Sequence, residues 1–303
     1  MDEAVISVRG LRKRYAAVEA VAGIDLDVGR GEIFAFLGPN GAGKTTTVEI
    51  LEGFRSRTEG EVRVLGVDPA HSGASWRNRV GCVLQESSVE PGLTVRECLE
   101  LYAGYYEKPR DIDDTIALAG LQGKAETLGE QLSGGQRRRL DVALALIGDP
   151  ELVFLDEPTT GFDPSARRAA WGVIDGLREL GKTVFLTTHY MDEAENLADR
   201  IAIISGGTIV AEGTPRTLGG RERMAVRISF TLPEGIAAAD LPLPISAVDG
   251  RVVVESERPL VDVKTLADWA LGRGIDLPDL DVRRPSLEHV YLQLTGAAGC
   301  GHT

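Results

Sequence analysis

The chain has 303 residues, of which 43 % are hydrophobic and 26 % are charged, and its formal net charge is -13 with neutral histidines. These proportions are typical of a globular protein that buries a core, so they exclude a disordered chain, and the length predicts two domains or one large and one small domain. The excess of acidic residues opposes a protein specialised for binding nucleic acid.

The sequence carries no signal for membrane insertion or secretion. No apolar run approaches the roughly 18 to 20 residues that a membrane-spanning helix needs, and the N-terminus carries Asp2 and Glu3 where a signal peptide would be basic. The cysteines Cys82, Cys98 and Cys300 form no CxxC pair and no zinc spacing. We therefore expect a chain of a reducing, cytosolic compartment that works at a membrane only by docking on another protein.

Short apolar runs alternate with helical patterns in the first part of the chain. The expected strands cover residues 5–8, 24–28, 33–37, 61–64, 80–84, 152–155, 183–187 and 201–204. The run at 152–155 is apolar throughout, which is typical of a parallel strand covered on both faces. The pattern predicts an α/β fold.

A glycine-rich loop follows the expected strand 33–37 and precedes a helical pattern at 45–52. Its residues, Gly38-Pro39-Asn40-Gly41-Ala42-Gly43-Lys44-Thr45, match the pattern G-x-x-x-x-G-K-[ST]. Glycines let backbone N–H groups turn inward around a phosphate, Lys44 adds a positive charge, and the Thr45 hydroxyl suits Mg²⁺. The alternative is a glycine-rich turn without a ligand, and the flanking strand and helix oppose it.

Between residues 86 and 150 the strand pattern stops, and helical patterns at 95–106, 112–119 and 135–147 predict a helical insertion. Within it, Leu132-Ser133-Gly134-Gly135-Gln136 joins a loop to the start of a helix. Ser133 and the glycine N–H groups could form a second phosphate cradle. One γ-phosphate cannot easily use two cradles of one chain, so this cradle would serve the nucleotide of a neighbouring molecule. We interpret the following run, Arg137-Arg138-Arg139, as a solvated helix face.

Two carboxylates, Asp156 and Glu157, end the apolar run 152–155. An acid at the carboxyl end of a strand beside a phosphate loop can hold the water shell of a metal, so Asp156 is a candidate Mg²⁺ ligand. Glu157 is then the candidate base that orients or deprotonates the attacking water. The alternative is a pair of solvated acids at a strand end.

The order of these motifs along residues 1–218 resembles the ATP-binding cassette (ABC) ATPases, the nucleotide-binding subunits of membrane transporters. Further matches to that pattern, in chain order, are Tyr15, Gln85, Gly161-Phe162-Asp163 and His189. Two positions depart from it: Ala16 stands where the family usually has glycine, and Phe162 where leucine is more common.

The resemblance implies a role for each of these residues. Tyr15 would stack on adenine, Gln85 would bind near Mg²⁺ and report the nucleotide state, and His189 would donate to the γ-phosphate. Asp163 would lie at a dimer interface and link its two sites. The alternatives are a Tyr15 ring packed in the core and a structural or solvated His189.

The implied site has three groups of residues. Catalysis would fall to Glu157, His189 and Gln85. Metal binding would fall to Thr45, Gln85 and Asp156. Nucleotide binding would fall to Tyr15, Gly38, Pro39, Asn40, Gly41, Ala42, Gly43, Lys44, Thr45, Thr46, Ser133, Gly134, Gly135, Gln136 and Asp163. The implied cofactors are ATP and Mg²⁺.

The composition changes at Gly219-Gly220, where we place a domain boundary. Residues 1–218 would form a P-loop NTPase domain of the ABC-ATPase type with a helical subdomain at about 86–150, and residues 219–303 a small α+β accessory domain. The elements expected there are strands at 224–230 and 251–255, a proline-rich loop at 232–244 and a helix at 260–271.

The segment 284–292 resembles the terminal segment of drug-resistance exporter ATPases of the daunorubicin and doxorubicin type. Ser286 suits a helix N-cap. The apolar face of this helix would carry Leu287, Val290, Tyr291 and Leu294. The helix either closes a small core, or its apolar face contacts a second subunit or regulates assembly.

The resemblance implies that two copies of the chain close around two MgATP, and that hydrolysis opens this homodimer and drives a separately encoded membrane permease. The chain would be cytoplasmic and peripheral on the inner face of the cell membrane, and the transporter would export drugs or other hydrophobic compounds. One alternative is a soluble cassette ATPase that acts on nucleic acid or ribosomes, which the single phosphate loop and the lack of sustained heptads oppose. Another is a small-molecule P-loop kinase, which leaves Gln85 and His189 without roles. We expect no nucleic-acid partner.

Overall fold

The computed structural model describes residues 4–84, 90, 92–233, 235–248 and 251–296. The chain forms two compact units, one of Met1–Pro215 with Leu294–Thr303 and one of Arg216–Gln293. Among the described helices, none combines the length and the apolar character that a bilayer crossing requires.

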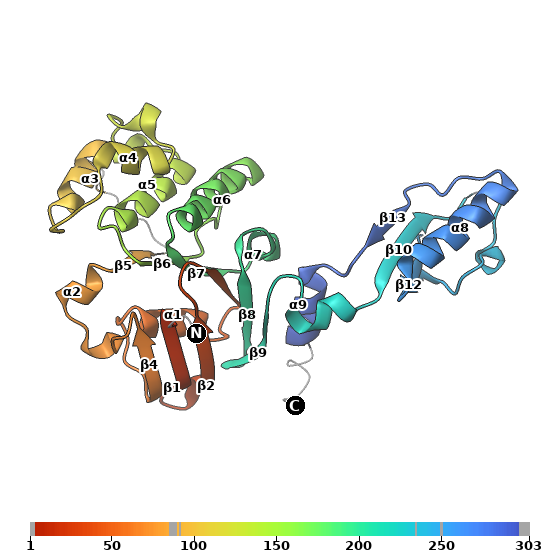
Figure 1. Cartoon of the computed structure of the whole chain (residues 1–303), viewed down its shortest axis with the longest axis horizontal. Helices are drawn as coiled ribbons and strands as arrows, with labels where there is room; N and C mark the ends of the chain where they lie inside the picture. Colours follow the sequence, from red (N-terminus) through yellow and green to blue (C-terminus); the bar gives the residue numbers. More distant parts are fainter. Residues whose placement is uncertain (1–3, 85–89, 91, 234, 249–250, 297–303) are drawn as a thin grey trace. The chain divides into compact units, whose positions relative to one another are not determined.

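A six-stranded sheet organises the first unit (Figure 1). Its order is β5-β6-β7-β3-β8-β9, and all neighbouring strands are parallel except the antiparallel pair β8 and β9. The strands are β3 (Ile33–Leu37), β5 (Val80–Val83), β6 (Leu152–Asp156), β7 (Thr183–Thr188), β8 (Arg200–Ser205) and β9 (Thr208–Gly213). Every residue of β3 and β7 is buried because the sheet is covered on both faces. The predicted α/β fold is confirmed.

A three-stranded antiparallel sheet covers one face of the first sheet, with helix α1 (Lys44–Leu51) in the same core. Its order is β2-β1-β4, formed by β1 (Ile6–Tyr15), β2 (Val18–Val28) and β4 (Glu59–Val64). Phenylalanines Phe34 and Phe154 of the larger sheet belong to this core. Strands β1 and β2 are longer than predicted. The additional residues of β1 are mostly charged and give no apolar signal, whereas those of β2 are mostly small or apolar and do not stand out as a strand.

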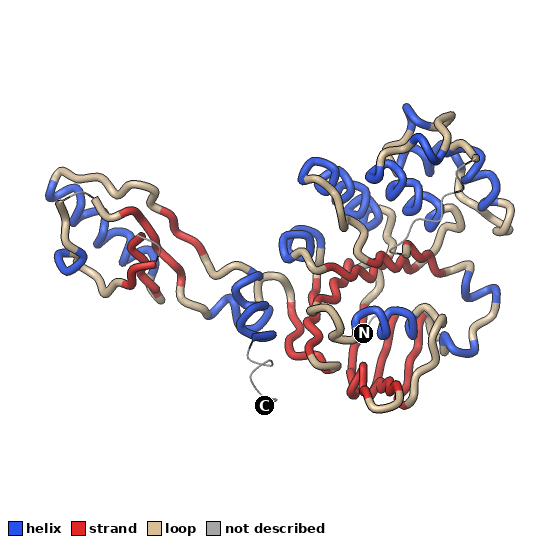
Figure 2. Tube along the Cα trace, turned by 180° about the vertical axis from the view of Figure 1, so that it is seen from behind, coloured by secondary structure: helices blue, strands red, loops and turns tan. Residues whose placement is uncertain are grey.

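In the described part of the insertion between β5 and β6, the α-helices are α3 (Val95–Ala103), α4 (Ile112–Leu118) and α5 (Gly134–Leu146) (Figure 2). Their apolar faces meet in a cluster of their own, which includes Leu99, Ile116 and Leu140. Short helical turns complete this layer and the preceding segment: η1 (Pro69–His71), α2 (Ala74–Arg77), η2 (Gln122–Lys124) and η3 (Gly129–Gln131).

Helices α6 (Pro164–Glu179) and α7 (Met191–Leu197) contribute to the core on the other face of the large sheet, together with residues of α5. Each follows a strand directly, α6 after β6 and α7 after β7, just as α1 follows β3. The carboxyl ends of these adjacent parallel strands open at one edge of the sheet, and their loops therefore converge there.

The second unit is a four-stranded antiparallel sheet of order β11-β12-β10-β13 with one long helix. Its elements are η4 (Leu218–Arg223), β10 (Val226–Thr231), η5 (Ala238–Asp240), β11 (Ser246–Val248), β12 (Arg251–Ser256), α8 (Pro259–Arg273), β13 (Asp281–Arg283) and the start of α9 (Leu287–Gly296). Alternate residues of β10, such as Ile228 and Phe230, pack against α8. The Ser286 hydroxyl accepts from the His289 N–H at 3.2 Å, which confirms the predicted N-cap of α9.

Candidate functional site

The loop between β3 and α1 has room for glycine alone at two points. A Cβ on Gly43 would lie 2.4 Å from the carbonyl oxygen of Ala20, and its φ of +107° belongs to the left-handed region. A Cβ on Gly38 would lie 2.4 Å from the carbonyl oxygen of Ile204. The loop is therefore pressed against the neighbouring backbone and keeps the start of α1 at the sheet edge.

Lys44 begins α1 and is buried, although it carries a charge. Its Nζ donates to the Gly38 carbonyl at 2.7 Å and to the Pro39 carbonyl at 3.2 Å, so the ammonium lies within the curve of the loop. Burial lowers the pKa of Lys44, while the charges of Glu157 and Asp156 raise it. The loop thus holds a positive charge close to Asp156, the candidate metal ligand, and to Glu157, the candidate base.

Asp156 and Glu157 stand at the carboxyl end of β6. The hydroxyl of Thr187, on the neighbouring strand β7, donates to Oδ1 of Asp156. Glu157 has a φ of +45°, rare for a residue with a side chain, and its N–H donates to the Thr187 carbonyl at 3.1 Å. Strand β7 therefore fixes the backbone at the turn that presents the two acids.

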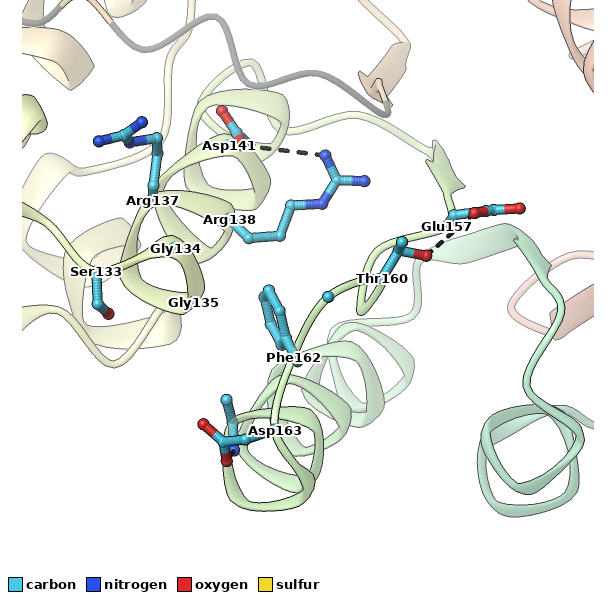
Figure 3. A pocket seen from close by; sticks show the side chains of 12 residues that line it. Ser133, Gly134, Gly135, Arg137, Arg138, Asp141, Glu157, Thr160, Phe162 and Asp163 are labelled. Atoms are coloured by element: carbon cyan, nitrogen blue, oxygen red, sulfur yellow. Dashed lines mark hydrogen bonds and ion pairs between the residues drawn. The ribbon is translucent and has the colours of Figure 1, made fainter.

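The Glu157 carboxylate lies between two polar side chains. Nδ1 of His189 is 3.4 Å from Oε2 of Glu157. The Thr160 hydroxyl donates to the same oxygen at 3.0 Å, as Figure 3 shows. The Glu157 side chain is 16 % exposed and that of His189 is 41 % exposed, so the pair borders solvent. The structure brings together two residues that lie 32 positions apart in the chain and that the sequence assigned to catalysis.

A cavity of about 470 Å³ lies between the start of α5 and the loop from β6 to α6 (Figure 3). Its lining includes Ser133, Gly134 and Gly135 on one side and Glu157 and Asp163 on the other. Of the residues described for its lining, none belongs to the phosphate loop. The two predicted cradles are therefore separate places on one molecule.

The side chains at the start of α5 and α6 are occupied by capping. Ser133 and Gln136 form a capping box, in which the Gln136 N–H donates to the Ser133 hydroxyl at 3.3 Å and the Ser133 N–H donates to Oε1 of Gln136 at 3.0 Å. Asp163 accepts from the N–H groups of Ala166 and Ser165, and these hydrogen bonds lower the pKa of Asp163.

Tyr15 ends β1 and is 37 % exposed, so its ring is not packed in the core. Lys13 Nζ lies 5.1 Å and Arg55 Cζ 5.4 Å from the ring centre, which is within the range of cation–π contacts. Gln85, assigned to catalysis and metal binding, lies outside the described residues.

The interpretation of residues 137–139 as a solvated face is wrong for Arg138, which is 8 % exposed. Its guanidinium donates to the carbonyls of Leu84, Asp156 and Pro158, the last two at 2.6 Å and 3.2 Å. It therefore joins α5 to the ends of β5 and β6. Helical spacing carried the signal, because Val142 and Ala145 lie four and seven residues on and are also buried.

The oxygen donors at this edge suit Mg²⁺, which prefers carboxylate, hydroxyl, phosphate and water oxygens. Thr45 supplies a hydroxyl and Asp156 a carboxylate. Within the described ranges, no group of three or more histidine, cysteine or acidic side chains forms a closed metal cage. This donor set fits an ion held jointly by protein and substrate.

Comparison with known proteins places both units in one family. Residues 21–160 match a family model described as ABC transporter, and residues 226–286 match one described as the C-terminal domain of ABC transporter domain-containing proteins. The daunorubicin resistance ATP-binding protein DrrA3 of Streptomyces coeruleorubidus is 37 % identical over 98 % of this chain and 97 % of its own length. The Nod factor export ATP-binding protein I of Burkholderia pseudomallei (strain 1710b) is 41 % identical over 98 % of each.

Solved structures give the same result for the first unit. CbiO1 of Clostridium perfringens, described as part of an ABC transporter complex, has a TM-score of 0.66 and 26 % identity over 71 % of this chain and 90 % of its own. The cassette MJ0796, in a dimer described as bound to ADP and Pi, has a TM-score of 0.62 and 26 % identity over 69 % of this chain and 98 % of its own.

Proposed function

Because this chain belongs to the ATP-binding cassette transporter family, we propose that it hydrolyses ATP with Glu157 as the base and so drives export through a separate membrane permease. The observation that carries this assignment is the contact between Glu157 and His189, whose Oε2 and Nδ1 are 3.4 Å apart, at the sheet edge where the phosphate loop begins. ATP binding and hydrolysis are the activity of the family.

The phosphate loop supplies the binding half of the site. Lys44 and the backbone N–H groups of the loop hold the β- and γ-phosphates. On binding ATP, the Lys44 ammonium exchanges its hydrogen bond to the loop carbonyl for hydrogen bonds to phosphate. Thr45 and Asp156, with Gln85, hold Mg²⁺, which when bound neutralises phosphate charge and helps to align the triphosphate. Glu157 accepts a hydrogen bond from the attacking water, and the His189 ring donates to the γ-phosphate.

The second cradle supplies the other half from a partner copy. Ser133, Gly134 and Gly135 border a cavity that contains no residue of the phosphate loop among those described, which supports a nucleotide held between two molecules. The dimeric form of the similar cassette MJ0796 supports the same arrangement. We assign the remaining predicted residues to this shared site: Tyr15 to adenine, Asp163 to the dimer interface, and Pro39, Asn40, Gly41, Ala42, Thr46 and Gln136 to the loop and helix starts that line the nucleotide.

The cargo and the location are proposed from the relatives. Full-length relatives are named for daunorubicin resistance and for Nod factor export, so we propose export of a drug or another hydrophobic compound. The chain would then lie at the cytoplasmic face of the membrane, bound to its permease, with residues 1–218 as the ATPase domain and 219–303 as an accessory domain. The same relatives oppose the alternative of a soluble cassette that acts on nucleic acid or ribosomes.

The substitution Glu157→Gln tests the assignment. It should keep ATP binding, lower phosphate release by at least about 100-fold because the base is lost, and give a dimer that size-exclusion chromatography detects only with ATP. Glu179→Gln is the matched control, because Glu179 is exposed at the end of α6. Phosphate release by Glu157→Gln at the parental rate would show that Glu157 is not the base.

A further inference from the structure

A buried carboxylate that the catalytic scheme does not use lies behind the site. Glu193, on α7, is 0 % exposed, and its Oε1 accepts two hydrogen bonds. The Thr159 hydroxyl donates at 2.9 Å and the Trp171 indole N–H at 3.1 Å. Thr159 follows β6 and Trp171 lies in α6, so one carboxylate joins three segments of the chain.

Burying a carboxyl group such as that of Glu193 costs free energy, because the group loses its hydration. Burial raises the pKa of Glu193, while hydrogen bonds from Thr188, Thr159 and Trp171 and the charge of Arg167 lower it. An apolar side chain of similar volume would fill the same space without a desolvation cost. Packing alone therefore does not account for a carboxylate here, whereas the fixed positions of its donors do.

Glu193 and its donor Thr159 are close in the chain to the two proposed catalytic residues. Thr159 is two residues after Glu157, and Glu193 itself is four residues after His189, on the helix that begins just beyond the histidine. The bond between Thr159 and Glu193 therefore ties the segment that carries the base to the segment that carries the histidine.

The turn that Glu193 holds has an unfavourable backbone. Glu157 has a φ of +45°, and such a conformation persists only where the surroundings fix it. On one side, Arg138 donates to the carbonyls of Asp156 and Pro158. On the other side, Glu193 accepts from Thr159. The four residues 156–159 are thus held between two buried polar side chains, the guanidinium of Arg138 and the carboxyl group of Glu193.

We propose that Glu193 is a positioning residue for ATP hydrolysis: by accepting from Thr159 and Trp171, it fixes the turn after β6 so that Glu157 stays beside His189. This inference rests on the proposed function, because it acts through Glu157. It assigns Glu193 no contact with nucleotide.

The test compares hydrolysis and nucleotide affinity in two variants of the full chain. Thr159→Val keeps the shape of the side chain and removes the donor, and Glu193→Ala removes the acceptor. Each should lower kcat about tenfold, since small displacements of a catalytic group are costly, and leave the Kd for ATP within about twofold. The double variant should lose no more than the worse single variant, because Thr159→Val removes a hydrogen bond that Glu193→Ala also removes.

Two further variants separate positioning from packing. Glu193→Gln keeps an acceptor oxygen and should retain kcat within about threefold of the parent. Glu195→Gln makes the same charge change at an exposed position of the same helix and should leave kcat unchanged. If Glu193→Ala does not fold, Thr159→Val alone decides.

Parental kcat in Thr159→Val, or a loss of kcat matched by an equal loss of ATP affinity, would overturn the inference while leaving the proposed function intact. If the parental chain itself released no phosphate from ATP, the proposed function would fail first, and this inference with it.

Discussion

The carboxyl edge of the six-stranded sheet in the first unit and the four-stranded sheet of the second unit place their ionisable side chains in opposite ways. At the carboxyl edge of the six-stranded sheet, Lys44, Arg138 and Glu193 are buried, and carbonyls, hydroxyls or an indole N–H hold each of them. On the four-stranded sheet, Arg227 is exposed and lies opposite Glu255 on one neighbouring strand and Arg283 on the other.

An exposed charged group keeps its hydration and costs little free energy, whereas a buried one is stable only with hydrogen-bonding or charged partners in fixed positions. The edge of the first sheet is therefore specified residue by residue, which is what catalysis on a triphosphate requires. The core of the second unit specifies a fold, because Ile228 and Phe230 are fully buried, whereas Arg227, on the other face of the same strand, is exposed. Substitutions in the two units should consequently differ both in size and in kind.

The largest difference should come from Lys44→Ala. The ammonium is already inside the phosphate loop, so its loss removes several charge-assisted hydrogen bonds to phosphate and should weaken ATP binding by at least about 100-fold. Isothermal titration with ATP measures this. Lys182→Ala is the control in the same unit, because Lys182 pairs with Asp149, which is not among the predicted site residues. Unchanged affinity in Lys44→Ala would reject the phosphate-loop assignment.

The next largest effect should be on stability. Arg138→Gln leaves carbonyls of Leu84, Asp156 and Pro158 without their buried donor, and should lower the free energy of unfolding by about 3 to 5 kcal/mol. Urea denaturation measures it. Arg137→Gln, one residue earlier and only partly buried, should change stability by about 0.5 kcal/mol or less. Equal effects of the two variants would show that Arg138 does not join the helices to the sheet.

The error at Arg138 shows where sequence reasoning succeeds and where it stops. Gly38, Gly43 and Lys44 could be predicted because a phosphate loop needs particular residue types in a fixed order, and its backbone has no room for others. Arg138 could not be separated from its neighbours by charge alone, because one turn of helix carries both exposed and buried positions. Glu193 gave no signal, since its partners Thr159 and Trp171 lie 34 and 22 residues away. Strands β11 and β13, of three residues each, are too short for a pattern.

A smaller and pH-dependent effect is expected at Glu52, which follows α1. Burial raises the pKa of Glu52 to about 7, with further contributions from Asp156 and Glu49, while a hydrogen bond with Cys82 lowers it. Between pH 4.5 and 7 the folded chain holds a proton that the unfolded chain has lost, so stability falls as pH rises through this window. The full shift corresponds to roughly 3 kcal/mol.

Glu52→Gln should therefore raise the free energy of unfolding at pH 8 and leave it nearly unchanged at pH 4.5. Urea midpoints at the two pH values give the difference. Glu61→Gln, at an exposed position of β4, should show no such pH dependence. A gain of equal size at both pH values would mean that the carboxyl of Glu52 does not titrate in the folded chain within this window.

The smallest effect should be that of Arg227→Gln in the second unit. Arg227 lies opposite Arg283 on one neighbouring strand and opposite Glu255 on the other. Losing its charge removes a repulsion from Arg283 and an attraction to Glu255, and these two changes have opposite effects on stability. Stability should change by about 0.5 kcal/mol or less, and ATP hydrolysis should stay at the parental rate. A clear fall in hydrolysis without a fall in stability would contradict this expectation. It would mean that the exposed residues of the four-stranded sheet influence catalysis at the edge of the six-stranded sheet.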